Sequence, residues 1–250
     1  MIENYALSSK GLYQILKAKN VEYLYHANTV LTAKTFIQQR CLLSRHQVES
    51  DKLLQSPQKS DPEDKKYDVW DAIFLDGADL HVKYSQPNFY GPVLFKIKLD
   101  MLISPSFEKV YVTKSNPMYW SDHTKIEDKY YGTLDQFKVD YLTTTKLDSQ
   151  IMFTFRTPLR ELKLNKFLHS IEIDEPKILL KLKSGGEMEA GKYVRSAIEE
   201  EMAKYGLSHI PLETKQHNLL SKCSCAFGYT YLYNTNYLEF KRRFTRQPEN

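Results

Sequence analysis

The stretch at residues 23–45 constrains the fold most, because a strand and a helix meet in it at a single histidine. Bulky residues at positions 23–25 favour an extended strand. Asn28 or Thr29 can then cap a helix whose apolar residues recur at helical spacing. His26 therefore lies at a strand-to-helix junction, where side chains are commonly accessible to a ligand. The alternative is a structural histidine that is hydrogen-bonded at the edge of a sheet.

Helical and strand patterns both occur in this chain of 250 residues, 42% of which are apolar, so it can bury a sizeable core. We expect one α+β domain over residues 1–250. Glycine is scarce, with 9 residues, and no Walker or G-x-G-x-x-G motif occurs. A chain that binds a nucleotide without such a loop must hold it with side chains in a cleft. The formal net charge of +4 is modest and decides nothing about the fold.

Cysteine usage and the N-terminal residues indicate the compartment. Only three cysteines occur, and the N-terminus lacks the charged and apolar regions of a secretory signal. No apolar run approaches the roughly 20 residues of a membrane span. We expect a reduced, cytoplasmic protein with no membrane partner. His217, Cys223 and Cys225 offer three zinc ligands, but their spacing matches no common zinc module, so we expect no metal.

Periodicity predicts the remaining elements. Helices are expected at about residues 9–19 and from about 194 to Gly206, which suits the position after a helix end. Strands are expected at 69–75, 92–99, 151–155, 167–173 and 178–182, and a hairpin-like stretch at 229–240. Residues 50–66 are polar and contain two prolines, which predicts a long mobile loop. The alternative for this loop is a disordered surface insertion.

The sequence Leu-Tyr-His-x-x-Thr at residues 24–29, followed by a helix and by Leu-Leu-Ser-Arg at 42–45, resembles the opening motif of the ADP-ribosyltransferase superfamily. The resemblance implies an ADP-ribosyltransferase-like α+β fold in which two small sheets with flanking helices form a cleft for NAD. It implies that Arg45 holds the pyrophosphate or assists the acceptor. The other cofactor-binding residues implied by this motif are His26, Asn28 and Thr29.

The superfamily's second motif implies an aromatic or small hydroxyl residue beside the nicotinamide ring. This part of the chain offers Tyr90 as the first choice and Tyr84 as the second. Either tyrosine can equally well pack on the sheet. In the DarT-like toxins, which the Leu-Leu-Ser-Arg ending resembles most, the region that matches residues 50–66 closes over NAD.

The third motif of the superfamily is a catalytic glutamate late in the fold. Glu187 matches its place best, and Glu189 is the alternative, both on a glycine-flanked turn after the expected strand at 178–182. Such an acid stabilises the positive charge that develops on the ribose and can deprotonate the acceptor. The structural alternative is a solvated acid at a helix start, where the helix dipole favours it.

The C-terminal segment at residues 237–250 interleaves basic and aromatic residues, a pattern suited to phosphates and stacked bases. A solvated, frayed C-terminus is the alternative. The candidate nucleic-acid-binding residues in this segment are Tyr237, Lys241, Arg242, Arg243 and Arg246.

The implied function is an NAD-dependent ADP-ribosyltransferase toxin that releases nicotinamide and modifies a nucleobase in single-stranded nucleic acid, RNA ahead of DNA. This acceptor follows from the resemblance to DarT-like toxins and to CmdT-like RNA-modifying toxins of toxin–antitoxin–chaperone phage-defence systems. The partners so implied are NAD, RNA or DNA, an antitoxin protein and a chaperone. The alternatives are a protein-modifying ADP-ribosyltransferase, an RNA 2′-phosphotransferase, and a non-enzymatic module that retains the scaffold.

Overall fold

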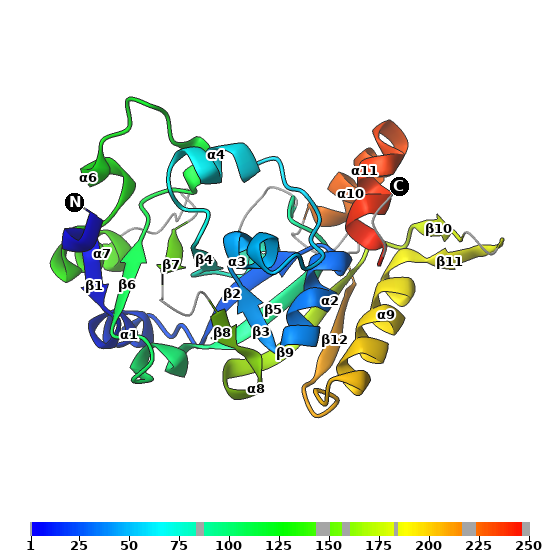
Figure 1. Cartoon of the computed structure of the whole chain (residues 1–250), viewed down its shortest axis with the longest axis horizontal. Helices are drawn as coiled ribbons and strands as arrows, with labels where there is room; N and C mark the ends of the chain where they lie inside the picture. Colours follow the sequence, from blue (N-terminus) through cyan, green and yellow to red (C-terminus); the bar gives the residue numbers. More distant parts are fainter. Residues whose placement is uncertain are drawn as a thin grey trace.

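The computed structural model describes residues 2–83, 88–143, 151–156, 161–182, 185–216 and 224–246, and in these ranges an eight-stranded sheet organises a mixed α+β fold (Figure 1). The strand order is β1 (Ala6–Ser8), β6 (Lys109–Val112), β7 (Met152–Phe155), β4 (Ile73–Asp76), β2 (Tyr23–Asn28), β5 (Val93–Lys98), β9 (Leu168–Glu175) and β12 (Leu212–Gln216). Strands β9 and β12 are parallel, and all other neighbours are antiparallel.

Two small sheets and a set of helices surround this large sheet. Strand β3 (Cys41–Leu43) pairs with β8 (Glu161–Lys163), and β10 (Leu179–Lys181) pairs with β11 (Glu187–Glu189). The helices are α1 (Ser9–Ala18), α2 (Val30–Gln39), α3 (Arg45–Ser50), α4 (Asp61–Lys66), α5 (Leu80–Lys83), α6 (Ile126–Lys129), α7 (Leu134–Thr143), α8 (Leu164–Phe167), α9 (Ala190–Lys204), α10 (Cys225–Thr235) and α11 (Tyr237–Phe244). Short 3-10 turns occupy Ile2–Tyr5, Leu99–Ile103 and Pro117–Tyr119.

The large sheet consists of two halves that meet at one residue pair. Strands β2 and β4 share only the pair Tyr25 and Asp76, whereas β2 pairs with β5 along its whole length and β4 does so with β7. The expectation of two separate small sheets around a cleft was therefore wrong, because this single pair joins both halves into one sheet. A strand pair this short lets the two halves diverge on either side of the join.

Local sequence explains the elements next to the join. Thr29 caps α2, its side-chain oxygen accepting the Thr32 N–H, as the junction pattern predicted. The helix ends at Arg40, whose left-handed φ of 54° turns the chain into β3. Ser44 then caps α3 by accepting the Gln47 N–H at 3.1 Å, so that Arg45 is the first residue of that helix.

Three expected elements differ in the structure. The expected hairpin at 229–240 is wrong, because the segment forms α10 and α11, with Asn236 capping the second helix. Residues 61–66 of the expected loop form α4, which has a proline in its first turn. The strand expected at 69–75 begins only at Ile73, because Val69 and Ala72 are bonded in turns to Asp64 and Val69 respectively.

The other expected elements are confirmed, with boundaries shifted by a few residues. These are α1, β2, α2, β5, β7, β9, β10 and α9, and Gly206 has a φ of +73° after the end of α9. The core draws fully buried side chains from both halves of the sheet, including Leu24, Phe95 and Phe153. Within the described ranges, none of the helices is both long enough and apolar enough to cross a bilayer.

Candidate ligand-binding site

A cavity of about 520 Å³ opens where the two halves of the sheet meet. Its wall is built by β2, α2 and β4, by the segments 55–64, 69–72, 88–90 and 116–119, and by α11. These segments lie far apart in the sequence, and Figure 1 shows α4 and α11 on the same side of the sheet. The volume falls within the roughly 300–1,000 Å³ typical of small-molecule and cofactor sites.

His26 lines the cavity from the middle of the sheet. Its Nδ1 atom lies 2.8 Å from the carbonyl oxygen of Phe74, and its Nε2 atom lies 3.3 Å from the side-chain nitrogen of Asn28. Burial lowers the pKa of His26, so the imidazole is neutral at pH 7. A neutral ring with Nδ1–H bonded to a carbonyl leaves Nε2 as an acceptor toward Asn28 and the cavity.

Asn28 also lines the cavity, but Thr29 does not face it. The Thr29 side chain is fully buried, and its hydroxyl donates to the Ser56 hydroxyl at 2.9 Å. Thr29 was expected to bind the cofactor. Its observed contacts instead cap α2 and attach the segment 51–60 to that helix.

Tyr90 lies in the cavity wall and is fixed from both ends. Its hydroxyl accepts from the Asn116 side-chain amide at 2.6 Å, and its backbone N–H donates to the Asn88 side chain at 2.9 Å. The other tyrosine that the sequence suggested, Tyr84, lies outside the described residues.

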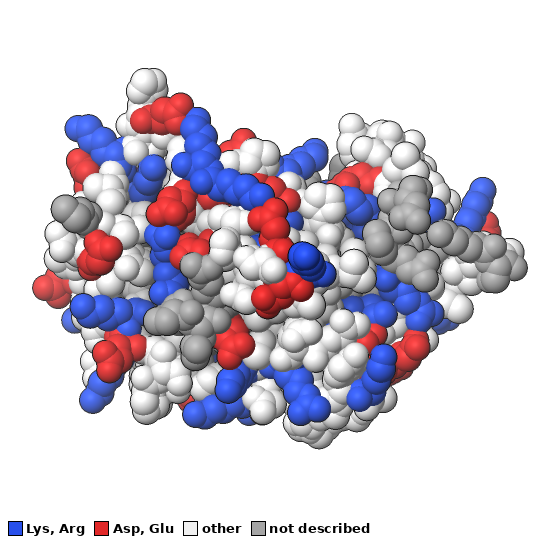
Figure 2. Space-filling view, in the orientation of Figure 1, with Lys and Arg blue, Asp and Glu red and all other residues white. Residues whose placement is uncertain are grey.

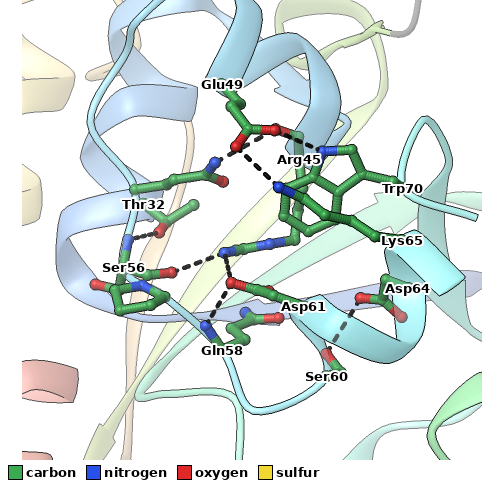
Figure 3. Close-up of polar contacts among 12 residues, drawn as sticks. Thr32, Arg45, Glu49, Ser56, Gln58, Ser60, Asp61, Asp64, Lys65 and Trp70 are labelled. Atoms are coloured by element: carbon green, nitrogen blue, oxygen red, sulfur yellow. Dashed lines mark hydrogen bonds and ion pairs between the residues drawn. The ribbon is translucent and has the colours of Figure 1, made fainter.

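Arg45 lines the cavity and is bonded to the segment 51–60, and Figure 3 shows these polar contacts. Its Nη2 atom donates to the Asp61 carboxylate at 2.8 Å and to the Ser56 carbonyl at 3.0 Å, and its guanidinium lies over the Trp70 ring. The Ser56 N–H donates in turn to the Thr32 hydroxyl at 3.0 Å. The segment 51–60, which belongs to the region expected to close over NAD, is therefore held at the cavity by hydrogen bonds to Arg45 and Thr32.

Two donor atoms of Arg45 remain unsatisfied. Nε and Nη1 are buried and have no hydrogen-bond partner among the described residues. Burial is the main cause that lowers the pKa of this guanidinium, and the Asp61 carboxylate opposes it. An unpaired buried donor on a charged group is costly, and an anionic oxygen is the partner that best relieves the cost.

Carboxylates reach the cavity from Asp64, Asp76 and Glu239. Burial raises the pKa of Asp64 to about 6, against the opposing effect of the Ser60 hydroxyl, which donates to it at 3.2 Å. A carboxyl group with this pKa can exchange a proton near neutral pH.

Glu187 and Glu189 are not among the described residues that line the cavity. Both lie on β11, in the hairpin that extends from the body of the molecule at the right of Figure 1. Glu187 is exposed, and Glu189 pairs with Lys192 at 2.7 Å. Gly185 and Gly186, with φ values of +84° and +83°, form the turn of this hairpin, and their own surroundings are open space. The glycines thus serve a tight turn, and the structure does not bring the expected catalytic acids to the site.

The expected nucleic-acid-binding segment is helical and largely engaged within the fold. Arg242 and Arg243 line the cavity from α11, and both pair with Glu239, at 2.6 and 2.9 Å. Arg242 also donates to the carbonyl of Pro57 and so links α11 to the segment 51–60. The alternative of a solvated, frayed terminus is wrong for these two residues, because α11 holds them and the carboxylate of Glu239 pairs with both.

The other residues of that segment have similar roles. Arg246 pairs with Glu200 at 2.6 Å and covers the Tyr193 ring, while Tyr237 packs against Tyr233. Lys241 directly precedes Arg242 on α11 and is partly buried. Figure 2 shows positive and negative side chains mixed over the visible face, without a continuous basic stripe.

Several wall residues had no signal in the sequence. Asn88 and Asn116 belong to segments without periodic pattern, and Trp70 lies in the strand expected at 69–75, so the place of all three in the wall depends on long-range packing. Phe89 and Tyr119 line the cavity with 60% and 68% of their surface exposed, which puts two aromatic rings at its solvent edge. No protein-family model matches this chain, and no curated protein is significantly similar to it in sequence.

Proposed function

We propose that this protein is an ADP-ribosyltransferase that binds NAD in the cavity beside the sheet join. The observation that carries the proposal is that His26 and Arg45, from the two ends of the opening motif, line the same cavity as Tyr90, the first choice for the second motif. NAD would supply the ADP-ribosyl group, with nicotinamide as the leaving group.

The binding residues fit the chemistry of such a ligand. The two unsatisfied donors of Arg45 suit the oxygens of a pyrophosphate, because a guanidinium offers several N–H groups in one plane. The Nε2 atom of His26 and the side chain of Asn28 suit hydroxyl and amide groups. Tyr90, held by Asn116, offers a flat ring to a planar group.

The acid–base role falls to a carboxylate in the cavity. Asp64 is our first candidate, because its pKa of about 6 lets it stay ionised at pH 7.5 and accept a proton from an acceptor. Glu187 and Glu189 are not part of the proposal, since they do not line the cavity.

We propose an unpaired nucleobase as the acceptor, in RNA ahead of DNA. Phe89 and Tyr119 support this choice, because exposed rings at the edge of a cavity can stack on a base that is not hidden in a duplex. A toxin role with an antitoxin partner rests only on the resemblance to DarT-like toxins.

A non-enzymatic nucleotide-binding module is the second candidate. The observation that favours it is the absence of Glu187 and Glu189 from the described lining of the cavity. Such a module would bind NAD and release no nicotinamide.

Nicotinamide release from NAD, measured with single-stranded RNA, single-stranded DNA, duplex or a protein mixture, tests the proposal. We expect release that depends on the unsubstituted cavity and is strongest with single-stranded RNA. Binding without release under every condition would favour the module. Release with the protein mixture alone would favour the protein-modifying alternative, and no binding of NAD would overturn both candidates.

A further inference from the structure

A second cluster of ligating side chains lies behind the wall of the cavity, where three distant segments meet. His81 lies in α5, Asp174 near the end of β9, and Cys225 at the start of α10. All three are buried, with at most 3% of their surface exposed, and their donor atoms lie within 4.8 Å of one another. Leu80 and Asn88, the direct neighbours of this cluster, line the cavity.

Two of these side chains are each held by an outer partner. The Nδ1 atom of His81 lies 2.9 Å from the Asp79 carboxylate, which leaves Nε2 for a second contact. The Tyr229 hydroxyl donates to Oδ2 of Asp174 at 2.6 Å, which leaves Oδ1 on the side of the histidine. Nε2 and Oδ1 are 2.7 Å apart. A carboxylate on the far nitrogen is the usual orienting partner of a metal-binding histidine.

The cysteine has an outer partner as well. The backbone N–H of Asn88 donates to the Sγ atom of Cys225 at 3.2 Å, and such a bond stabilises a thiolate. Each of the three side chains thus has one fixed partner on its outer side and presents one donor atom to the others. The donor set is one nitrogen, one oxygen and one sulfur.

We propose that His81, Asp174 and Cys225 bind a divalent transition-metal ion, with Zn²⁺ as the best fit. Mixed nitrogen, oxygen and sulfur ligands suit Zn²⁺, whereas Mg²⁺ and Ca²⁺ require oxygen ligands. Tetrahedral ligands of zinc lie roughly 3.4 Å apart, so Nε2 and Oδ1 must separate by less than 1 Å. A water or another donor completes the fourth position. Metal binding here does not require that the cavity binds NAD or that the protein is a transferase.

The bound ion would fix one wall of the cavity. It would join α10 to β9 and α5, and α10 packs on α11 through the Tyr229 and Phe244 rings, whose centroids are 5.0 Å apart. Helix α11 in turn carries Arg242 and Arg243 into the cavity. The ion would therefore serve the position of these arginines and take no part in chemistry on the ligand.

The competing arrangement is a metal-free ion network. Burial opposes protonation of His81, but the Asp174 and Asp79 carboxylates outweigh it and raise its pKa to about 10. In this arrangement His81 is protonated, and its positive charge between two carboxylates takes the place of a metal ion. The two arrangements differ in whether the cysteine ligates an ion, which can be measured directly.

The experiment measures bound metal in the whole chain purified from zinc-supplemented cells, by mass spectrometry of the folded protein. We expect about one zinc per chain, and at least a tenfold loss in Cys225→Ser and in Asp174→Asn. Cys41, which is buried on β3, provides a matched control, and Cys41→Ser should keep the metal.

Two further measurements keep the proposal testable if a variant does not fold. Cobalt substituted into the unsubstituted protein should give a thiolate-to-cobalt absorption band, and this band should persist in Cys41→Ser. Asp79→Asn should weaken zinc binding by roughly 10- to 100-fold, as loss of an orienting partner does. Folded protein that binds no zinc on titration, or a cobalt spectrum without a thiolate band, would overturn the proposal.

Discussion

The sequence singled out two sets of residues, one in the cavity beside the sheet join and one on the β10–β11 hairpin. The two regions differ in how far neighbouring residues fix the side chains in place. In the cavity, Asp61 and Ser56 fix Arg45, and the Phe74 carbonyl fixes His26. On the hairpin, Glu187 is exposed. Binding sites need side chains whose positions are set by their neighbours before the ligand arrives. The cavity meets this requirement and the hairpin does not.

Among the substitutions that test this difference between cavity and hairpin, Arg45→Ala is expected to have the largest effect on NAD binding. The variant loses the donors for a pyrophosphate and leaves the Asp61 carboxylate unpaired, so the segment 51–60 loses its main attachment. Hydrogen bonds to charged groups contribute about 1.5–3 kcal/mol each, so we expect NAD affinity to fall by tenfold to several hundredfold. Calorimetry measures this loss. Arg195→Ala, on α9 and outside the cavity, is the matched control and should bind NAD normally.

His26→Ala should have a smaller effect. It removes one acceptor and one contact in the wall while the strand pairing of β2 stays intact. A lost hydrogen bond costs about 1 kcal/mol, which corresponds to a roughly fivefold weaker affinity for NAD. His169→Ala is the control, because His169 packs on Tyr23 and does not line the cavity. Equal affinities in both variants would return His26 to a structural role.

Asp64→Asn should change stability with a sign that depends on pH. The folded-state pKa of about 6 lies above the ordinary 3.8, so the favourable contribution of Asp64 is present at low pH and is lost as the pH rises through about 6. The amide mimics the neutral acid, so the variant should gain thermal stability at pH 8 and little at pH 4. About 1 kcal/mol shifts Tm by about 2–4 °C in a domain of this size. A gain of the same size at both pH values, or in exposed Asp135→Asn, would contradict this assignment.

The smallest effect is expected from Glu187→Gln on the hairpin. Its carboxylate is exposed and lies outside the described cavity lining, so NAD binding and nicotinamide release should stay within twofold of the unsubstituted protein. A drop in nicotinamide release of the order of 10²-fold is typical for loss of a catalytic acid or base, and it would assign that role to Glu187 on the hairpin.

Local patterns predicted the parts of the structure that depend on neighbouring residues. The cap at Thr29, the strand before it and the alternation in β5 follow from residue types within a few positions. The sequence did not indicate that Glu187 lies away from the cavity, because glycines beside an acid suit both a ligand approach and a hairpin turn, and only the open surroundings of Gly185 separate the two.

Long-range packing explains what the sequence did not reveal. The tyrosines at 229, 231 and 233 alternate like a strand, yet Tyr229 is buried because it packs on Phe244 across two helices. Trp70 contacts Arg45 and Asn116 donates to Tyr90, and both contacts join residues far apart in the sequence. Likewise, His81, Asp174 and Cys225 share no spacing that would mark them as a cluster.

Hydrogen–deuterium exchange with and without NAD compares the two regions in one measurement. The account predicts slower exchange in segments 26–32, 44–61 and 88–91, which surround the cavity, and unchanged exchange in the hairpin at 179–189. Arg45→Ala should abolish this protection. Protection confined to the hairpin, or no change around the cavity at saturating NAD, would contradict the central claim that the cavity beside the sheet join binds NAD.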